Sequence, residues 1–289
     1  LTAAAGAVCN LFCAAPDEAG LFPLAFVGSA RRPAWLKGTR GQLMSAQYGT
    51  ADLAETGLWS LHTHRVIEPD QRLLDRCKAL GEAFLAVQSE GAIPAWLGVQ
   101  AGQVVPAGPL QTGATTASAG RFLAHLAAAT DDDRFSAAAQ RAADFVLDRV
   151  WPAQEWFDFE TFFAGCSKPL SWRDRESGAP PQSALALNWA ADLLAEVATQ
   201  TKQERYLEQG TLILDQLLLF QQIWDASFLD CDTFGGFGVS NTSGAWSDVR
   251  GALFVPTLLR YYELTGRQEY LERAVAALRA AFVLMHAPE

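Results

Sequence analysis

Apolar residues recur along most of this chain with the spacing of amphipathic helices. In the segments rich in Leu and Ala they fall at i, i+3, i+4 and i+7, which places them on one helix face. Phe145, Leu185, Leu193, Leu214 and Leu218 lie on such stripes. Alternation of apolar and polar residues, the pattern of strands, occurs only in short runs, so the chain is predicted to be all-α. The predicted helices lie at about residues 1–15, 50–66, 69–88, 115–129, 133–150, 180–199, 203–224, 247–264 and 267–285.

Prolines and polar residues predict how several of these helices begin. Pro180 and Pro181 suit the first turn of the helix at 180–199, because a residue there needs no N–H for the helix ladder. Thr50 or Asp52 is expected to cap the helix that begins near residue 50. Pro256 lies inside the helix at 247–264 and is expected to kink it.

A short polar turn occurs three times between consecutive helices. Residues 130–135, 201–206 and 265–270 each start with Thr and carry an aromatic residue five positions later. The aromatic positions are separated by 71 residues (206 − 135) and by 64 residues (270 − 206). Helix pairs that recur at such intervals indicate stacked helical hairpins. The acidic run 131–133 lies in the first of these turns and is expected to cap a helix rather than to bind a metal.

Long connections alternate with these short turns, at residues 16–49, 89–114, 151–180 and 225–246. Helix connections usually need two to eight residues, so segments this long and rich in Gly, Pro and Trp predict a functional surface at one end of the hairpins. The segment 234–250 combines four glycines with aromatic and polar residues, as a binding loop does. The alternative is an ordered loop that closes the end of the helical core.

Composition excludes some classes of partner. The formal net charge of −10 at pH 7 argues against nucleic acid, which requires a basic surface. No apolar run reaches the roughly 18 residues of a membrane span. The five cysteines include no CxxC pair, and His62 and His64 point apart on their helix, so we expect no metal and no cofactor. The segment 1–15 lacks the basic start of a signal peptide. We expect it to be a helix inside a longer natural protein of the cytoplasm or periplasm.

The chain resembles the six-hairpin glycosidase superfamily in its Thr-x4-aromatic turns, in the motifs Gly91-Ala92-Ile93-Pro94 and Gly235-Gly236-Phe237-Gly238, and in the helices that open after them. The resemblance covers nearly the whole chain and implies one (α/α)6 toroid domain over residues 1–289. A full ring has twelve helices and the pattern predicts nine, so we expect an incomplete ring or further segments outside this sequence. The superfamily includes uronyl hydrolases, other glycosidases, polysaccharide lyases and sugar epimerases, so the fold alone does not select the reaction.

Carboxylates in the long connections are candidates for catalysis of glycoside cleavage, which needs a general acid and a second carboxylate as nucleophile or base. Asp158 and Glu160 lie among aromatic residues, which raise a carboxyl pKa by desolvation and suit a general acid. Asp248 lies in the first turn of a predicted helix, where the dipole keeps it ionised as a base for water. The other carboxylates on this side are Asp52, Glu55 and Asp174. Helix capping or pairing with an arginine is the alternative for each acid.

Other long-connection residues are candidates for substrate binding. Arg173 and Arg250 have the guanidinium fork that pairs with the carboxylate of an acidic sugar. The candidates for stacking on sugar rings are Trp96, Trp156, Trp172 and Trp246, with loop packing as the alternative.

These residues predict a glycoside hydrolase that acts on an oligosaccharide containing a uronic or otherwise acidic sugar, with this substrate as its partner. The first alternative is a polysaccharide lyase, in which Tyr48 takes part in proton transfer and Asn241 polarises the substrate carboxylate. The second is a non-catalytic helical-repeat module that binds a glycan or a protein through the same loops.

Overall fold

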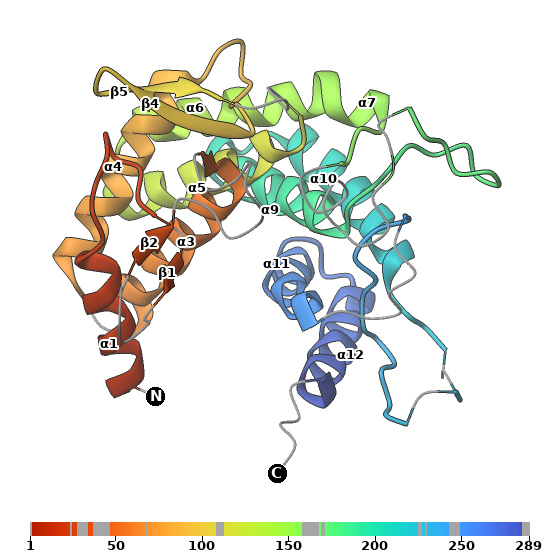
Figure 1. Ribbon diagram of the computed structural model, residues 1–289. Helices are drawn as coiled ribbons and strands as arrows, with labels where there is room; N and C mark the ends of the chain where they lie inside the picture. Colours follow the sequence, from red (N-terminus) through yellow and green to blue (C-terminus); the bar gives the residue numbers. More distant parts are fainter. Residues whose placement is uncertain are drawn as a thin grey trace. The chain divides into compact units, whose positions relative to one another are not determined.

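The computed structural model describes residues 2–23, 25–27, 34–36, 47–67, 69–107, 113–157, 168, 171–224, 227–228, 230–242 and 249–284. These ranges are mainly helical, which confirms the predicted fold class (Figure 1). The chain divides into two compact units, Leu1–Val146 and Leu147–Glu289. None of the described helices combines the length and the apolarity needed to cross a membrane.

The first unit contains helical hairpins and two small sheets. Its helices are α1 (Thr2–Cys13), α3 (Thr50–His62), α4 (Gln71–Val87), α5 (Thr115–Thr130) and α6 (Asp133–Phe145). π-helical turns follow α3 over Thr63–Ile67 and α6 over Val146–Val150. Its strands are β1 (Ala25–Val27), β2 (Ala34–Leu36), β3 (Tyr48–Gly49), β4 (Trp96–Gln100) and β5 (Gln103–Pro106). β1 pairs with β2, the second sheet has the order β3-β4-β5, and all pairs are antiparallel.

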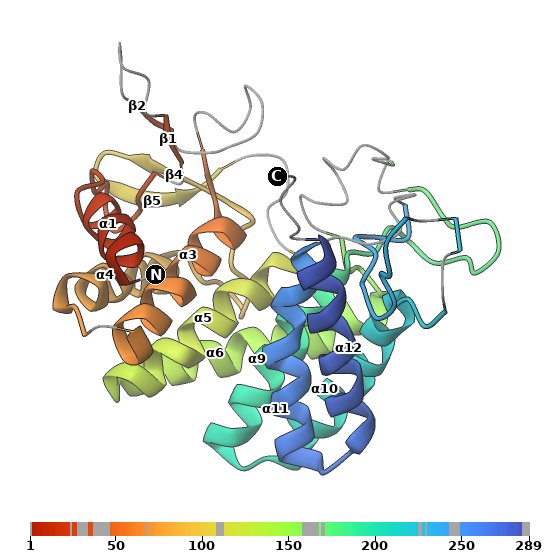
Figure 2. The same cartoon turned by 90° about the horizontal axis from the view of Figure 1, so that it is seen from below.

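The second unit consists of two helical hairpins and their connections. Its helices are α7 (Trp151–Ala153), α9 (Ala184–Thr201), α10 (Glu204–Leu217), α11 (Val255–Thr265) and α12 (Gln268–Leu284). 3-10 helices span Leu218–Phe220 and Val249–Phe254. α9 packs on α10, and α11 runs beside α12 in both views (Figure 2). Buried alanines on α9, such as Ala190 and Ala191, leave room for the neighbouring helices to approach closely.

The five short strands were not predicted. They lie in the connections 16–49 and 89–114 and have two to five residues each, too few for alternation to stand out from chance. The prediction that Thr50 or Asp52 caps α3 was also wrong. The N-cap is Gly49, which has no side chain to cap the helix. The Thr50 hydroxyl instead donates to the Pro94 carbonyl at 2.5 Å, which ties the start of α3 to the strand connection.

Two predictions about prolines were wrong for the same reason. In both cases the helix begins at a later residue than the sequence suggested. α9 starts after Pro180 and Pro181, with Ser183 as its N-cap, whose hydroxyl accepts from the backbone N–H of Ala186. Pro256 does not kink a helix. It lies in the first turn of α11, where the missing N–H of proline costs no hydrogen bond. The 3-10 helix before α11 takes up the change of direction.

The three Thr-x4-aromatic turns share one structure, as the repeat predicted. Each Thr hydroxyl donates to the carbonyl four residues earlier, and the next residue is left-handed and ends the helix. Each aromatic side chain is buried: Phe135, Tyr206 and Tyr270. Asp132 caps α6 by accepting from the backbone N–H of Arg134 at 3.0 Å, so the expectation that the acidic run is a helix cap is confirmed.

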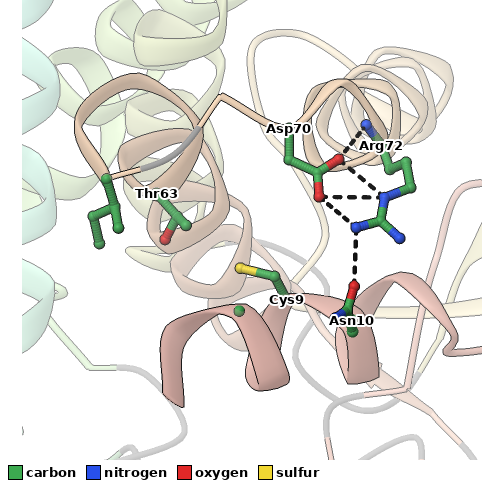
Figure 3. Close-up of a pocket in the computed structure, with 7 residues that line it drawn as sticks. Cys9, Asn10, Thr63, Asp70 and Arg72 are labelled. Atoms are coloured by element: carbon green, nitrogen blue, oxygen red, sulfur yellow. Dashed lines mark hydrogen bonds and ion pairs between the residues drawn. The ribbon is translucent and has the colours of Figure 1, made fainter. Parts of the chain in front are cut away.

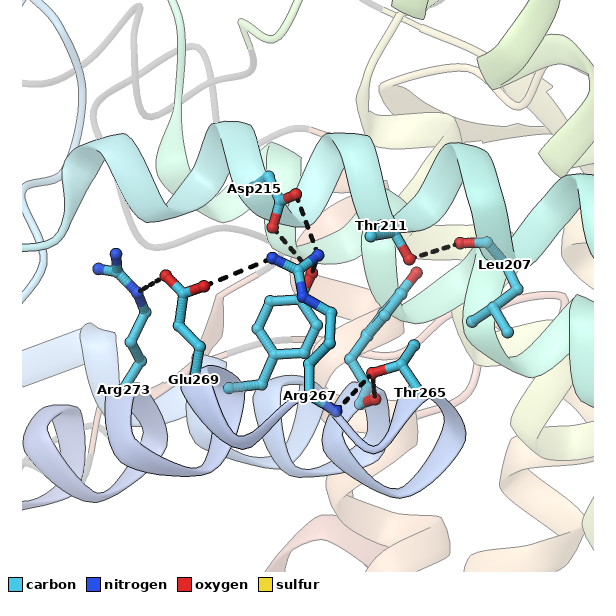
Figure 4. Close-up of polar contacts among 9 residues, drawn as sticks. Leu207, Thr211, Asp215, Thr265, Arg267, Glu269 and Arg273 are labelled. Atoms are coloured by element: carbon cyan, nitrogen blue, oxygen red, sulfur yellow. Dashed lines mark hydrogen bonds and ion pairs between the residues drawn. The ribbon is translucent and has the colours of Figure 1, made fainter.

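A network of polar side chains joins α10 to α12 next to the third turn (Figure 4). The Asp215 carboxylate accepts from the Tyr270 hydroxyl at 2.8 Å and from Arg267 at 3.3 Å. Glu269 accepts from Arg273 one turn further along α12, at 2.8 Å. Asp215 and Arg267 are about 40% exposed, so each pair contributes roughly 0–1 kcal/mol. The network aligns the hairpins and adds little to the stability of the unit.

A glycine lets α10 approach its neighbours closely. A Cβ on Gly210 would overlap the Tyr261 hydroxyl and lie 3.0 Å from the Leu194 Cβ. That hydroxyl is buried and donates to the Ala191 carbonyl at 2.8 Å. Gly210→Ala is therefore expected to lower the free energy of unfolding by about 2–3 kcal/mol, measured by urea denaturation.

The Gly210 prediction is tested by removing the group that the new methyl would meet. Tyr261→Phe should cost about 1 kcal/mol alone, through its lost hydrogen bond. Combined with Gly210→Ala, it should recover part of the loss, so the two changes are not additive. Strictly additive losses would show that the overlap with the hydroxyl is not the cause.

Candidate functional site

The three predicted catalytic carboxylates, Asp158, Glu160 and Asp248, lie outside the described residues, and so does Trp246. Their described neighbours belong to the second unit. Trp156 precedes the first two, and Arg250 follows the third, in the 3-10 helix before α11.

An open depression of about 840 Å³ lies on the second unit. Residues from four stretches line it: 153–154, 173–182, 216–220 and 240–241. Arg173 and Asn241, two of the predicted substrate-binding residues, are both among them. The fold thus brings together candidates that are far apart in the sequence.

Side-chain amides give the depression a polar wall. The Gln154 carbonyl oxygen accepts from the Gln216 amide at 2.7 Å and from the Gln182 amide at 3.5 Å. Gln154 has a left-handed backbone and donates to the Trp151 carbonyl, so the turn after α7 holds its side chain in place. Amides both donate and accept hydrogen bonds, which suits the hydroxyl groups of a sugar.

Asn241 forms hydrogen bonds that link two of the segments lining the depression. Its side-chain oxygen accepts from the backbone N–H of Gln182 at 2.7 Å, and its amide nitrogen donates to the Pro180 carbonyl at 2.8 Å. The backbone N–H of Asn241 also donates to the Gln182 carbonyl. In this structure the residue therefore positions the loop.

Arg173 is exposed, and it is the one charged side chain among the described residues that line the depression. Its neighbour Asp174 accepts from the backbone N–H groups of Glu176 and Ser177 and from the Ser177 hydroxyl. These bonds, with the backbone N–H of Ser177 first among them, lower the pKa of Asp174. The hydrogen bonds of this turn thus give Asp174 a structural role.

The tryptophans of this unit differ in access. Trp156 is fully buried, with its ring centroid 5.9 Å from that of Trp151. Its indole N–H has no hydrogen-bond partner among the described residues, and its carbonyl accepts from Ser183 at 2.6 Å. Trp156 is therefore part of the packed interior of the second unit. Trp172 is partly exposed, and its carbonyl accepts from the Arg173 guanidinium.

Arg250 lines a different and much narrower pocket, together with Phe237 and Phe254. These two rings meet edge to face, 4.9 Å between centroids, and both are buried. The glycine-rich motif around Phe237 therefore packs into the core of the second unit through this ring. The two candidate arginines do not share a pocket.

The remaining candidates, Tyr48 and Trp96, belong to the sheet of the first unit, and both are buried. The Tyr48 hydroxyl donates to the Glu18 carboxylate at 2.7 Å. Burial, and then this hydrogen bond, raise the pKa of Tyr48. Glu55 on α3 is paired with Arg121 on α5 at 2.6 Å, which matches the arginine-pairing alternative for that acid.

Sequence reasoning missed a polar stripe on α9. Asn188, Asp192 and Glu196 recur at i, i+4 and i+8 in a helix whose first four turns are otherwise apolar. Asn188 and Asp192 are buried, and the Asn188 amide has no hydrogen-bond partner among the described residues. Glu196 lies 3.3 Å from Arg260 on α11. The four-residue spacing of these polar groups was readable in the sequence as one face of a helix.

A second pocket, of about 110 Å³, lies in the first unit between α1 and the turn before α4 (Figure 3). Cys9 and Thr63 contribute to its wall. The Arg72 guanidinium is held there by Asp70 at 2.6 Å and by Asn10 at 3.0 Å. Both partners fix the guanidinium within the wall, and none of the predicted substrate-binding residues lines this pocket.

No family model matches the chain, and no curated protein matches it. Solved structures do. A sugar epimerase from a ruminal bacterium is 15% identical, with a TM-score of 0.62 over 93% of this chain and 67% of that one. A cellobiose 2-epimerase from Spirochaeta thermophila is 13% identical, with a TM-score of 0.61 over 97% and 69%. An unsaturated glucuronyl hydrolase specific for heparin is 14% identical, with a TM-score of 0.57 over 91% and 68%. At these identities the comparisons establish a shared fold.

Proposed function

From the helical-hairpin fold of the six-hairpin glycosidase superfamily, whose full form is the (α/α)6 toroid, we propose that this chain is a glycoside hydrolase. Its substrate is an oligosaccharide that contains a uronic or otherwise acidic sugar. The depression of the second unit binds that sugar, and carboxylates of the connections 151–180 and 225–250 cleave the bond.

The composition of the depression carries the proposal. Arg173 is the one charged group among its described lining residues, and three glutamine amides in the same lining add neutral donors and acceptors. A guanidinium binds a sugar carboxylate through two parallel hydrogen bonds. A carboxylate in the same wall would repel such a ligand, and the described part of the wall has none.

The chemical step is assigned to the carboxylates that the sequence predicts as catalytic. Glu160, or Asp158 beside it, protonates the leaving oxygen, and Asp248 activates the attacking water. No metal or cofactor takes part in this scheme, since proton transfer between carboxyl groups and water is sufficient.

A sugar epimerase is the second candidate, because the similar solved structures include a sugar epimerase and a cellobiose 2-epimerase. Such an enzyme inverts one stereocentre and leaves the glycosidic bond intact. The same amide-lined depression would suit a neutral sugar, and recognition would then rest on the amides and not on a sugar carboxylate bound by Arg173.

Product analysis separates these reactions. Uronic-acid oligosaccharides and neutral oligosaccharides of equal length are incubated with the protein in D₂O, and the products are followed by mass spectrometry, ultraviolet absorbance and NMR. Hydrolysis adds one water and creates a reducing end, and elimination creates an absorbing double bond. Epimerisation keeps the mass of the skeleton apart from exchanged deuterium. Hydrolysis of acidic substrates supports the proposal. Elimination alone, epimerisation alone or no turnover overturns it.

Arg173→Ala is expected to reduce kcat/KM on an acidic oligosaccharide by about ten- to a hundredfold, because a hydrogen bond to a charged group contributes about 1.5–3 kcal/mol. Activity on a matched neutral oligosaccharide should change little. Arg175→Ala is the control, since Arg175 is also exposed but does not line the depression. Equal losses on both substrates, or an equal effect of the control, would remove Arg173 from substrate recognition.

A further inference from the structure

Large apolar side chains are exposed in the loop that follows α10. Ile223 is 63% exposed, Trp224 52%, Phe228 66% and Phe234 43%. We call the described residues 223–224, 227–228 and 230–234 the apolar loop. Exposing these side chains forfeits the stabilisation that burial gives, about 25 cal/mol per Å². Clusters of this kind on a protein surface mark binding sites more often than scattered single residues do.

The apolar loop has a rigid base. Gln222 and Gly236 pair their backbones at 2.8 Å, and the Thr233 hydroxyl donates to the Gln222 side chain at 3.1 Å. Gln221 is buried, and its amide donates to the carbonyls of Gly235 and Arg273. Both ends of the loop are therefore fastened to the unit by buried amides. Its exposed side chains are held outward at low cost in conformational entropy.

Two of the exposed rings lie near each other. The centroids of Trp224 and Phe228 are 6.4 Å apart, and their planes are inclined by 60°. Flat rings with an accessible face suit the C–H face of a pyranose, which is apolar and of similar size, whereas its hydroxyl edges stay in water. Aliphatic side chains alone would offer no such planar surface.

The negative charge of the loop favours neutral sugars over acidic ones. Asp230 and Asp232 are exposed, and the sequence has no Lys or Arg between residues 206 and 249. Carboxylates accept hydrogen bonds from sugar hydroxyls and repel acidic sugars and anionic lipid surfaces. Arg273 lies at the base of the loop, where its guanidinium donates to the buried Gln221 side chain.

We propose that the apolar loop is a binding platform for neutral sugar units, with Trp224 and Phe228 stacked against their rings. It is lined by residues other than those of the depression that contains Arg173. The ligand class rests on the proposed function, for an oligosaccharide substrate in which neutral units accompany the acidic one. The platform holds the chain of the oligosaccharide, and it takes no part in the chemical step.

Affinity electrophoresis tests this platform without turnover. Hydroxyethylcellulose and galactomannan are the neutral probes, and polygalacturonate is the acidic one. The protein should be retarded by at least one neutral probe and less by the acidic one. Trp224→Ala combined with Phe228→Ala should weaken that binding about tenfold or more. Alanine substitution of an aromatic side chain that stacks on a nucleic-acid base has an effect of this order, about 1–3 kcal/mol per ring. Thermal unfolding shows that each variant is folded.

Phe282→Ala is the matched control, because Phe282 on α12 is as exposed as Phe228, at 66%, and lies outside the loop. The neutral probe should retard this variant as strongly as it retards the natural protein. An equal loss in this control, or no retardation of the natural protein by either neutral probe, overturns the proposal. So does a concentration-dependent oligomer that the double substitution dissociates, which would make the loop an interface between copies. Retardation without hydrolysis of any acidic substrate would overturn the proposed function and leave the platform standing.

Discussion

Gly91→Ala is expected to lower the free energy of unfolding by about 4 kcal/mol, because two costs add at one position. Gly91 has φ +84° and follows Glu90, at φ 49°, in a two-residue turn that pairs Ser89 with Ala92. A side chain costs about 1–2 kcal/mol in this left-handed conformation. A Cβ there would also overlap the Arg141 carbonyl oxygen and lie 3.0 Å from the Phe145 Cβ.

A second turn of the same geometry isolates the two costs. Gly102 has φ +78°, follows Ala101 at φ 51°, and connects β4 to β5. No atom lies within 4 Å of a Cβ built on Gly102. Gly102→Ala should therefore show the conformational cost alone, about 1 kcal/mol.

Urea denaturation of both variants measures the difference directly. Gly91→Ala should lower the free energy of unfolding by about 3 kcal/mol more than Gly102→Ala does. This difference is the cost of moving the backbone of α6 away from the turn. Equal losses for the two variants would show that the turn before α5 does not lie against α6 as the structure has it.

Glu160→Gln and Asp248→Asn are each expected to reduce turnover of an acidic oligosaccharide by about 10²–10⁴-fold, the usual effect of removing a general acid or base. An amide has nearly the shape of the carboxyl group but neither gives nor takes the proton. The effect should fall mainly on kcat, because neither residue is needed to hold the substrate.

Asp131→Asn is the matched control for these two substitutions. Asp131 is an exposed acid in the left-handed position of a short turn, where asparagine is tolerated well. Its amide should leave both activity and stability within experimental error. Undiminished turnover in both Glu160→Gln and Asp248→Asn would end the assignment of these two carboxylates. A loss in the control of similar size would show that the assay reports general damage.

The sequence predicted the helical hairpins well because their signal is local. The periodicity of apolar residues predicted where every long helix of the described residues lies. The Thr-x4-aromatic turn repeats as one structure because each Thr hydroxyl donates to a carbonyl of its own helix. The helix starts were less reliable. Ser183, rather than Pro180, begins α9, since a cap depends on which backbone N–H groups remain unpaired, and residue type alone does not show this.

Tertiary structure decided which candidate residues meet. Arg173 and Asn241 share a depression, whereas Arg250 lines another pocket and Trp156 is buried. None of this is periodic in the sequence, because contacts between loops depend on how distant segments pack.

By itself, then, the chain's pattern of apolar residues and turns determined a helical-hairpin protein with elaborate connections, since helix formation is governed by neighbours three and four positions away. The placement of amides around one arginine, the glycine turns seated against another helix, and the outward rings of the apolar loop required the folded structure. They arise where segments distant in sequence come within a few ångströms of one another, and only packing in three dimensions sets those distances.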